Sequence, residues 1–304
     1  MWFKNLKVFR LARHWQEHWG EIEHALSAHQ FTPVGDLSTS SQGWVPPREG
    51  DDRLAVNVGG QLLLALRIEK KLLPASVVNQ AVKDRAKEIE EQQGYRPGRK
   101  QMRDIKEMVI DSLMPSAFKV AKDVRVWIDP INCWVVLDTA SSPQVEDVLA
   151  AFGKAMHPYP VEPLRLTHSR AQQMTSWLIA GEAPEGLSID ADSHWQSGGN
   201  SAGVIKYAKC AAPPDDIQKR VESGYQCTRL ALTWQDRISF VLTDTADFKR
   251  VQALDILEEQ AKADGDLSEH EKLDADFTLM TAELNQMLGD VLEALKEQQQ
   301  NPPF

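Results

Sequence analysis

Hydrophobic residues alternate with polar ones in several stretches of the chain, and this period predicts β-strands. Residues 2–11 alternate and predict a first strand, and residues 54–74 contain two β-rich runs around Gly59-Gly60, which predicts a β-hairpin. The further strand-like segments are 118–141, a hairpin turning at 129–132, then 186–192, 203–210, and 226–256, a meander turning at 235–236 and near 245–247. Strands that follow one another through short turns predict a mainly antiparallel sheet.

Other stretches repeat hydrophobic residues every three to four positions, which predicts helices between the groups of strands. Trp15, Trp19, Ile22 and Leu26 fall on one face of a helix within residues 14–29. Further helices are predicted at 74–94, 99–113, 143–156, 169–180, from Pro214, and at 275–298, with a Gly/Ser/Pro-rich loop at 32–50. Helices interspersed among hairpins predict an α+β fold, with helices packed on the sheet.

The helices at 74–94 and 99–113 form a unit of their own in this pattern. Pro74 and Gly94 are typical helix boundary residues, and the short connection predicts an αα-hairpin that projects from the sheet. The expected segments are 1–73, an N-terminal α/β portion; 74–117, a basic helical hairpin; 118–250, a sheet region; and 251–304, an acidic helical region that packs back on the core.

The formal net charge of −10 is unevenly distributed along the 304 residues. Residues 251–304 contain 13 Asp/Glu and 3 Lys/Arg, so this segment alone has a net charge of −10. Because the chain totals are 44 acidic and 34 basic residues, residues 1–250 contain 31 of each sign. The acidic balance therefore does not exclude binding to a polyanion.

Composition and cysteine usage are those of a globular protein of a reducing compartment. The three cysteines, Cys133, Cys210 and Cys227, lack C-x-x-C spacing, which argues against a disulfide scaffold. No apolar run approaches the roughly 18 residues needed to cross a bilayer. The N-terminal stretch alternates like a strand and lacks the apolar region of a targeting peptide. A cytoplasmic protein without membrane contacts is expected.

Signatures of common enzyme classes are absent from the sequence. It contains neither a phosphate-binding G-x-x-x-x-G-K-[ST] motif nor a G-x-S-x-G nucleophile motif. His14, His18 and Glu21 share one helix face at i, i+4 and i+7, a spacing that can hold zinc, but the flanking tryptophans favour a packed aromatic stripe. Asp274 and Asp276 could serve a metal-dependent nuclease, yet at the predicted start of a helix they favour capping. No metal or cofactor is predicted.

Positive charge is concentrated in residues 94–108, "GYRPGRKQMRDIKEM". Its cations are Arg96, Arg99, Lys100, Arg103 and Lys106. On a helix, Met102, Ile105, Val109 and Leu113 share one apolar sector, and the last four cations project from another. One face is therefore expected to pack on the protein while the cations point outward together.

Arg99 and Lys100 fall in the first turn of this helix, where the helix dipole disfavours cations by about 0.3–1 kcal/mol each. This placement favours a face that binds an anion, although a merely solvated basic face is the alternative. Further cations occur at Lys119, Lys122, Arg125, Lys206 and Lys209. No base-reading motif accompanies them, so binding to DNA is predicted to use phosphate contacts, without sequence preference and with strong salt dependence.

A set of short stretches resembles the bacterial recombination-associated RdgC family along nearly the whole chain. In order they are "WFKNL" (2–6), "FTP" (31–33), "GWVPP" (43–47), "LP" (73–74), "MPSAF" (114–118), "WID" (127–129), "LALTWQDRISFVL" (230–242) and "DADFTLMTAEL" (274–284). The resemblance implies a non-enzymatic, ring-shaped homodimer whose basic central hole takes double- or single-stranded DNA. It also implies that the protein restrains RecA-promoted strand exchange, with no cofactor and with the nucleoid as its location.

Individual roles follow from position within this family. The resemblance places Phe118, together with Met114 and Pro115 of the same motif, at the dimer closure. The residue pattern alone, an aromatic after Pro115 at a helix–strand junction, predicts a core residue instead. It places Lys209 in the lining of the hole, where Cys210 replaces a family glutamine and removes an amide donor. The predicted DNA-binding residues are Arg96, Arg99, Lys100, Arg103, Lys106, Lys119, Lys122, Lys206 and Lys209.

Two other functions stay open at this point. One is a metal-dependent nuclease that uses Asp274, Asp276 or the early histidines. The other is an interaction module whose basic hairpin binds an acidic protein partner. The acidic segment 251–304 is expected on the outside of the ring, where it would repel other DNA.

Overall fold

The structure is a computed structural model, and it describes residues 2–12, 15, 21–36, 38–198, 203–254 and 268–296. Its strands are β1 Asn5–Leu11, β2 Ser40–Val45, β3 Ala55–Val58, β4 Gln61–Leu72, β5 Phe118–Asp129, β6 Trp134–Asp138, β7 Val161–Glu162, β8 Leu187–Ser197, β9 Val204–Tyr207, β10 Tyr225–Trp234, β11 Ile238–Thr243 and β12 Phe248–Ala253. Its helices are α1 Ile22–Ser27, α2 Ala75–Gln93, α3 Arg99–Leu113, the short 3₁₀ helix η2 Met114–Ser116, α4 Ser142–Ala155, α5 Arg170–Ala180, α6 Pro214–Glu222 and α8 Glu269–Ala294.

All these strands belong to one antiparallel sheet in the order β2-β4-β5-β6-β1-β12-β11-β10-β8-β9, with β3 paired to β4 and β7 to β1. The predicted α+β class with a mainly antiparallel sheet is confirmed. β1 joins the two halves of the sheet, because it pairs with β6 on one side and with β12 on the other. The N-terminal strand therefore joins the strands of residues 40–138 to those of residues 187–253.

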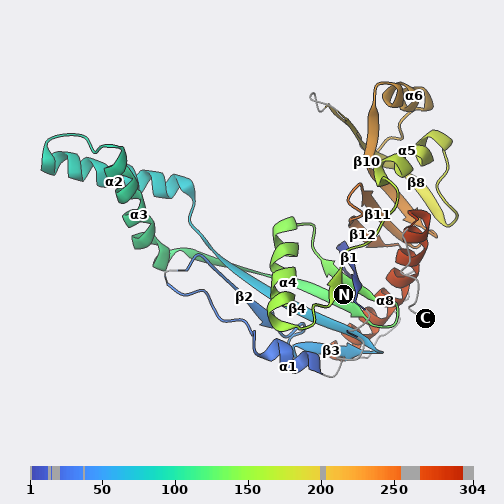
Figure 1. The fold of residues 1–304 in the computed structure, drawn as a ribbon, viewed down its shortest axis with the longest axis horizontal. Helices are drawn as coiled ribbons and strands as arrows, with labels where there is room; N and C mark the ends of the chain where they lie inside the picture. The colour runs from blue at the N-terminus through green and yellow to red at the C-terminus, as the bar shows by residue number, and fades with distance from the viewer. Residues whose placement is uncertain are drawn as a thin grey trace.

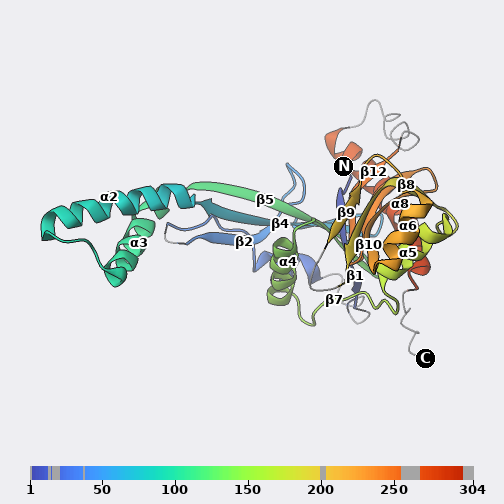
Figure 2. The same ribbon diagram turned by 90° about the horizontal axis from the view of Figure 1, so that it is seen from above.

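The molecule has the shape of an open crescent (Figure 1). Helices α2 and α3 extend beyond the ends of β4 and β5, and we call this pair the arm (Figures 1 and 2). Strands β8–β10 with α5 and α6 form the opposite end, and both ends turn toward the same side (Figure 1). This gives the crescent a concave side, with α4 between the two ends, and a convex side along which α8 runs.

Three hydrophobic cores support this shape. The largest lies between the β1–β12–β11–β10–β8 half of the sheet and helices α5 and α8. A second lies between β4, β5 and β6 and helices α1 and α4. The third belongs to the arm alone, where Val78 and Val82 of α2 pack with Ile105 and Val109 of α3. Because the arm has its own small core, it can extend away from the sheet.

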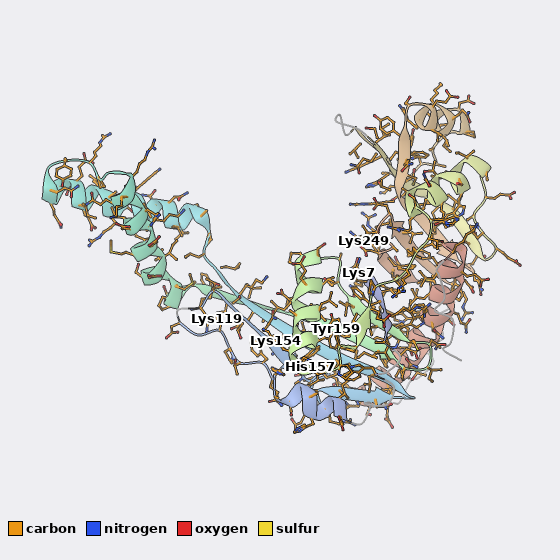
Figure 3. The ribbon with its side chains drawn as sticks, in the orientation of Figure 1. Lys7, Lys119, Lys154, His157, Tyr159 and Lys249 are labelled. Atoms are coloured by element: carbon orange, nitrogen blue, oxygen red, sulfur yellow. The ribbon has the colours of Figure 1, made fainter. Side chains whose placement is uncertain are left out.

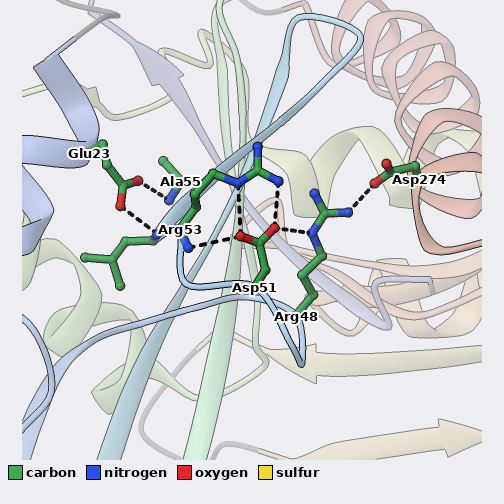
Figure 4. A network of polar contacts seen from close by, with 7 residues as sticks. Glu23, Arg48, Asp51, Arg53, Ala55 and Asp274 are labelled. Atoms are coloured by element: carbon green, nitrogen blue, oxygen red, sulfur yellow. Dashed lines mark hydrogen bonds and ion pairs between the residues drawn. The ribbon is translucent and has the colours of Figure 1, made fainter. Parts of the chain in front are cut away.

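A polar network fastens the loop between β2 and β3 to both neighbouring helices (Figure 4). Arg48 binds Asp51 at 2.9 Å and Asp274 of α8 at 2.6 Å. The Glu23 carboxylate of α1 accepts the backbone N–H groups of Leu54 and Ala55. Hydrogen bonds from the side chain and backbone of Arg53, with a smaller contribution from Arg48, hold the pKa of Asp51 well below its usual range.

Three expectations about local structure were wrong. Residues 40–45, predicted within a loop, form β2, because Trp44 is buried and the segment pairs along β4. Helix α8 begins six residues earlier than predicted, since Ser268 and Glu271 form a capping box. Asp274 and Asp276 therefore lie inside the helix and cap nothing. Most of the predicted helix before Ile22 lies outside the described residues.

Candidate nucleic-acid interface

The cations of the arm lie as the helical period predicts. Ile105, 1% exposed, and Val109 face α2, and Met102 and Leu113 pack against the same core. The side chains of Arg99, Lys100, Arg103 and Lys106 are exposed. One helix therefore presents four cations to solvent on the face away from its core.

Helix α3 carries three acidic residues against its four cations, so the positive charge is only partly offset. Arg103 lies 3.6 Å from Glu107, and Arg96 lies 3.3 Å from Glu90, both at exposed positions where such pairs are weak. Helix α3 begins after Gly98 without a side-chain cap and without an acidic residue in its first turn. The positive end of the helix dipole and the basic side chains therefore coincide at this end of α3.

Lys119 and Lys122 are not brought together by the fold. They lie three positions apart on β5, and successive strand residues point to opposite faces, so the two side chains leave the strand on different sides. The Lys119 ammonium donates a hydrogen bond to the carbonyl of Val34 at 3.0 Å, which ties it to the loop before β2. Lys122 is exposed.

A second group of cations lies on the sheet around Lys206. His194 of β8 is directly opposite Lys206 of β9 on one side and Arg229 of β10 on the other. Lys249 and Arg250 of β12 line the same small cavity as His194 and Arg229. We call His194, Lys206, Arg229, Lys249 and Arg250 the sheet cluster. Two cations therefore flank the His194 imidazole across the sheet, and their charges disfavour its protonated form.

A β-bulge in β12 explains how two consecutive cations reach one face. Phe248 and Val251 are both buried, although they are three positions apart. The register of β12 against β11 shifts at this point, and Arg250 has a φ of 53°. The extra residue leaves both Lys249 and Arg250 on the open face, because a bulge interrupts the alternation of side chains.

A second bulge acts in the same way in β10. Cys227 and Leu230 are both fully buried, and the register against β8 shifts between Cys227 and Arg229. Two residues, Thr228 and Arg229, therefore lie between consecutive core positions. Each of the two bulges lies beside the cluster of cations.

The electrostatics of the sheet cluster reflect this crowding. Partial burial, and then the positive charges of Arg229, Lys206 and Arg250, lower the pKa of His194, while Asp192 opposes them. Asp192 lies 3.7 Å from the Arg250 guanidinium. Its carboxylate also accepts the backbone N–H of Lys209 at 2.7 Å. Three cations and one imidazole thus line this cavity together with a single carboxylate, that of Asp192.

The sheet cluster lies on the concave side of the crescent. Figure 3 places Lys7 and Lys249 close together on that side, opposite the face covered by α5 and α8. Lys7 is neutralised by Asp247 at 2.6 Å, whereas no ion pair involves Lys249, Arg229 or Lys206 within the described residues. Helix α8, the described part of the acidic C-terminal segment, lies on the convex side (Figure 1).

Sequence reasoning identified Lys206 and Lys209 of this region and missed the rest. It treated the meander at 226–256 as regular strands, in which Lys249 and Arg250 would point to opposite faces. The available signal was the spacing of large hydrophobic residues, since Phe248 and Val251 break the period of two. Lys209 stands near the cluster, with a φ of 57° and an exposed side chain.

The predicted contact residues at the arm's base differ in exposure. Phe118 is 83% exposed and lies opposite Leu72, which is 51% exposed. Pro115 is exposed, but Met114 is only 7% exposed, so its side chain belongs to the chain's own interior. β6 pairs with β5 only from Val126 onward, which leaves the first part of β5 as a free edge within the described residues.

The candidate metal residues are not assembled into a site in the part of the chain that the structure describes. There, no three His, Cys, Asp or Glu side chains are grouped so that they could hold a metal ion. Asp274 pairs with Arg48. His14 and His18 lie outside the described residues, and Glu21 is described. None of the described helices is long and apolar enough to span a membrane.

Comparison with known proteins identifies the relatives of this chain. The family described as "Putative exonuclease, RdgC" matches residues 1–298. The chain belongs to the RdgC family. It is 47% identical to "Recombination-associated protein RdgC" of Bordetella parapertussis, over 97% of this chain and 98% of the relative. Proteins of the same name from Cupriavidus necator and a Janthinobacterium species are 46% and 43% identical over the same shares.

Membership in the RdgC family associates this chain with recombination. The two kinds of description differ in one respect, because the family description names an exonuclease whereas the relatives are named for recombination.

Proposed function

We propose that this RdgC-family protein binds DNA through phosphate contacts, without sequence preference, on the concave side of the crescent. The observation that carries the proposal is the sheet cluster, where Lys206, Arg229 and Lys249 stand on an open sheet face without ion pairs in the described chain. Cations crowded on one face repel one another, and a polyanion that lies over them offsets this repulsion. The exposed cations of α3 supply a second group of phosphate contacts.

We propose further that two copies close into a ring around the DNA. The exposed Phe118 and Leu72, beside a free edge of β5, support a contact between copies at the base of the arm. An apolar surface next to an unpaired strand edge favours association with another chain. A closed ring would turn weak phosphate contacts into long residence, because release requires opening or sliding off an end.

The proposed role in recombination is steric and not enzymatic. A ring on the chromosomal DNA of the cytoplasm would deny the RecA recombinase access to the duplex and so restrain strand exchange. The acidic helix α8 on the convex side would repel additional DNA and help keep the bound duplex inside.

The test compares closed circular and linear DNA of the same sequence. After loading at low salt, a wash at high salt should leave the protein on closed circles and release it from linear molecules, since only ends permit escape. Affinity measured on unrelated duplexes should be equal within about twofold, and its logarithm should fall linearly with the logarithm of salt concentration. Equal release from circles and linear DNA would contradict encirclement, and strong sequence preference would contradict phosphate readout.

A nuclease is the second candidate, because the family description names an exonuclease. The matching test incubates the full chain with end-labelled duplex and single-stranded DNA in the presence of Mg²⁺ or Mn²⁺. Shortening of the DNA that is lost in an Asp274→Asn or Asp276→Asn variant would establish this activity and replace the steric proposal. If the DNA stays intact under conditions where binding is complete, the nuclease is excluded and DNA binding remains as the function.

A further inference from the structure

The cavity at the centre of the sheet cluster is a built notch and not only a charged surface. Its volume is about 50 Å³, several times the roughly 10–15 Å³ that one bound water requires. Val241 of β11 contributes a short side chain opposite Lys249, and the longer side chains of His194, Arg229 and Arg250 surround it. We call this cavity the bulge notch, because the bulges in β10 and β12 supply its cations.

The groups that face the notch come from each strand around it. β8 supplies His194 and Asp192, and β10 supplies Arg229. Lys206 of β9 lies opposite His194 and is close enough to lower its pKa. β12 supplies Lys249 and Arg250, whereas β11 supplies only the apolar Val241. The His194 imidazole makes no hydrogen bond within the described residues, so its two nitrogens are available to a ligand. The described notch is therefore rich in donors and poor in acceptors.

We propose that the bulge notch binds one phosphate group of a nucleic-acid backbone, and that His194 takes up a proton when the site is filled. This inference rests on the proposed DNA binding and narrows it to a discrete contact. A tetrahedral phosphate accepts several hydrogen bonds at once, and arginine is the side chain best suited to donate two of them. A flat patch of cations would not need the space above Val241.

Proton uptake follows from the neighbours of His194. In the free protein, burial and the surrounding cations favour the neutral imidazole and lower its pKa. A bound phosphate offsets those cations and favours the imidazolium, so the pKa of His194 is higher in the complex. A group whose pKa rises on binding strengthens binding as the pH falls through the pKa of the complex, and the gain levels off below the pKa of the free protein.

The experiment measures binding of the full chain to a fluorescently labelled duplex by anisotropy, at constant ionic strength between pH 6 and pH 8. The wild type should bind at least about fivefold more tightly at pH 6, since a rise of one pKa unit corresponds to about tenfold. His194→Gln should match the wild type at pH 8 and change by less than about twofold between the two pH values. The matched control is His157→Gln, an exposed histidine on another part of the surface that should keep the wild-type dependence.

Filling the notch separates it from a diffuse patch. Val241→Phe adds bulk without changing charge on a half-exposed strand position, where an aromatic residue is well tolerated. It should weaken binding about as much as Arg229→Gln does, with an unchanged melting temperature. If Val241→Phe fails to fold, Arg229→Gln provides the test. The slope of log affinity against log salt concentration should become smaller in magnitude by about 0.9 in this variant.

A second probe, inorganic pyrophosphate, distinguishes failure of this inference from failure of the proposed function. The His194 imidazole resonance, assigned by its loss in His194→Gln, should shift on titration with pyrophosphate. If the wild type binds DNA and Val241→Phe, Arg229→Gln and His194→Gln bind it equally well, the notch is overturned and the proposed function is kept. A pyrophosphate shift without any DNA binding would keep the notch as a phosphate site and remove the proposed function. Absence of both would overturn both.

Discussion

The arm and the sheet cluster both gather positive charge, but they do so by different structural means. On α3 a regular helical period places Ile105 and Val109 inside and the cations outside, so the charged face could be read directly from the sequence. On the sheet, the cations come from several strands, and two bulges bring Arg229 and Arg250 to the open face. The exposed face of a helix follows from the local sequence period, whereas the exposed face of a sheet depends on the register between strands that are distant in the sequence.

The two regions also differ in how strongly repulsion between their cations destabilises the fold. The arm's cations are exposed, and solvent screens their mutual repulsion. Those of the sheet cluster are crowded enough to lower the pKa of His194. Crowded cations around a cavity gain more from one bound phosphate than dispersed ones do. We therefore expect the sheet cluster to contribute more to DNA affinity than the arm.

The largest effect is expected from neutralising the sheet cluster. The triple change Arg229→Gln, Lys249→Gln and Arg250→Gln should weaken binding to duplex by about a hundredfold at ~0.15 M salt, because three phosphate contacts are lost. Gel shift or anisotropy measures the change. The matched control, Lys219→Gln with Lys272→Gln and Lys296→Gln, removes the same charge from exposed positions on α6 and around α8. Equal loss in both triples would show that only net charge matters.

A smaller loss is expected from the arm. Arg99→Ala, Lys100→Ala and Arg103→Ala together should weaken binding by about tenfold, equally for all sequences, and should flatten the salt slope. Because cations oppose the helix dipole in the first turn and alanine favours helix, the arm itself should be no less stable. Circular dichroism during thermal melting checks this point. A loss larger than that of the sheet triple would reverse the ranking of the two regions.

Phe118→Ala tests whether the arm and the sheet cluster belong to one closed ring of two copies. Its side chain is 83% exposed, so the fold should be unaffected while association of copies weakens by at least about tenfold. Analytical sedimentation over a range of concentrations measures the association. Retention on closed circular DNA should fall with it, although initial binding should not. An unaltered dimer would remove Phe118 from the proposed closure.

The smallest effect concerns the network that holds the loop after β2 against α8. Asp51→Asn removes a carboxylate whose pKa is lowered in the folded chain by Arg53 and Arg48. A lowered folded pKa stabilises the protein above the unfolded pKa, roughly 4, and this contribution is lost as the pH falls below it. The variant should therefore melt a few degrees lower at pH 7, and the difference should shrink below about pH 4. A difference independent of pH would contradict an ionic origin.

Sequence patterns predicted most of the fold and only part of the site. The hairpin around Gly59-Gly60, the helices of the arm and the β10–β12 meander were correct, because each depends on local period and turn residues. β2 was missed because "SSQGWV" resembles a loop and becomes a strand only through pairing with β4. Arg229 and Arg250 were missed for a related reason, since their direction depends on bulges that form between strands.

Site-specific photo-crosslinking tests the central claim most directly. A benzophenone side chain placed at Ser239, on the same face of β11 as Val241, should crosslink to bound duplex, because that face is proposed to contact DNA. The same group placed at Ile179 of α5, an exposed position on the opposite face, should not. Efficient crosslinking from Ile179, with none from Ser239, would contradict binding on the concave side.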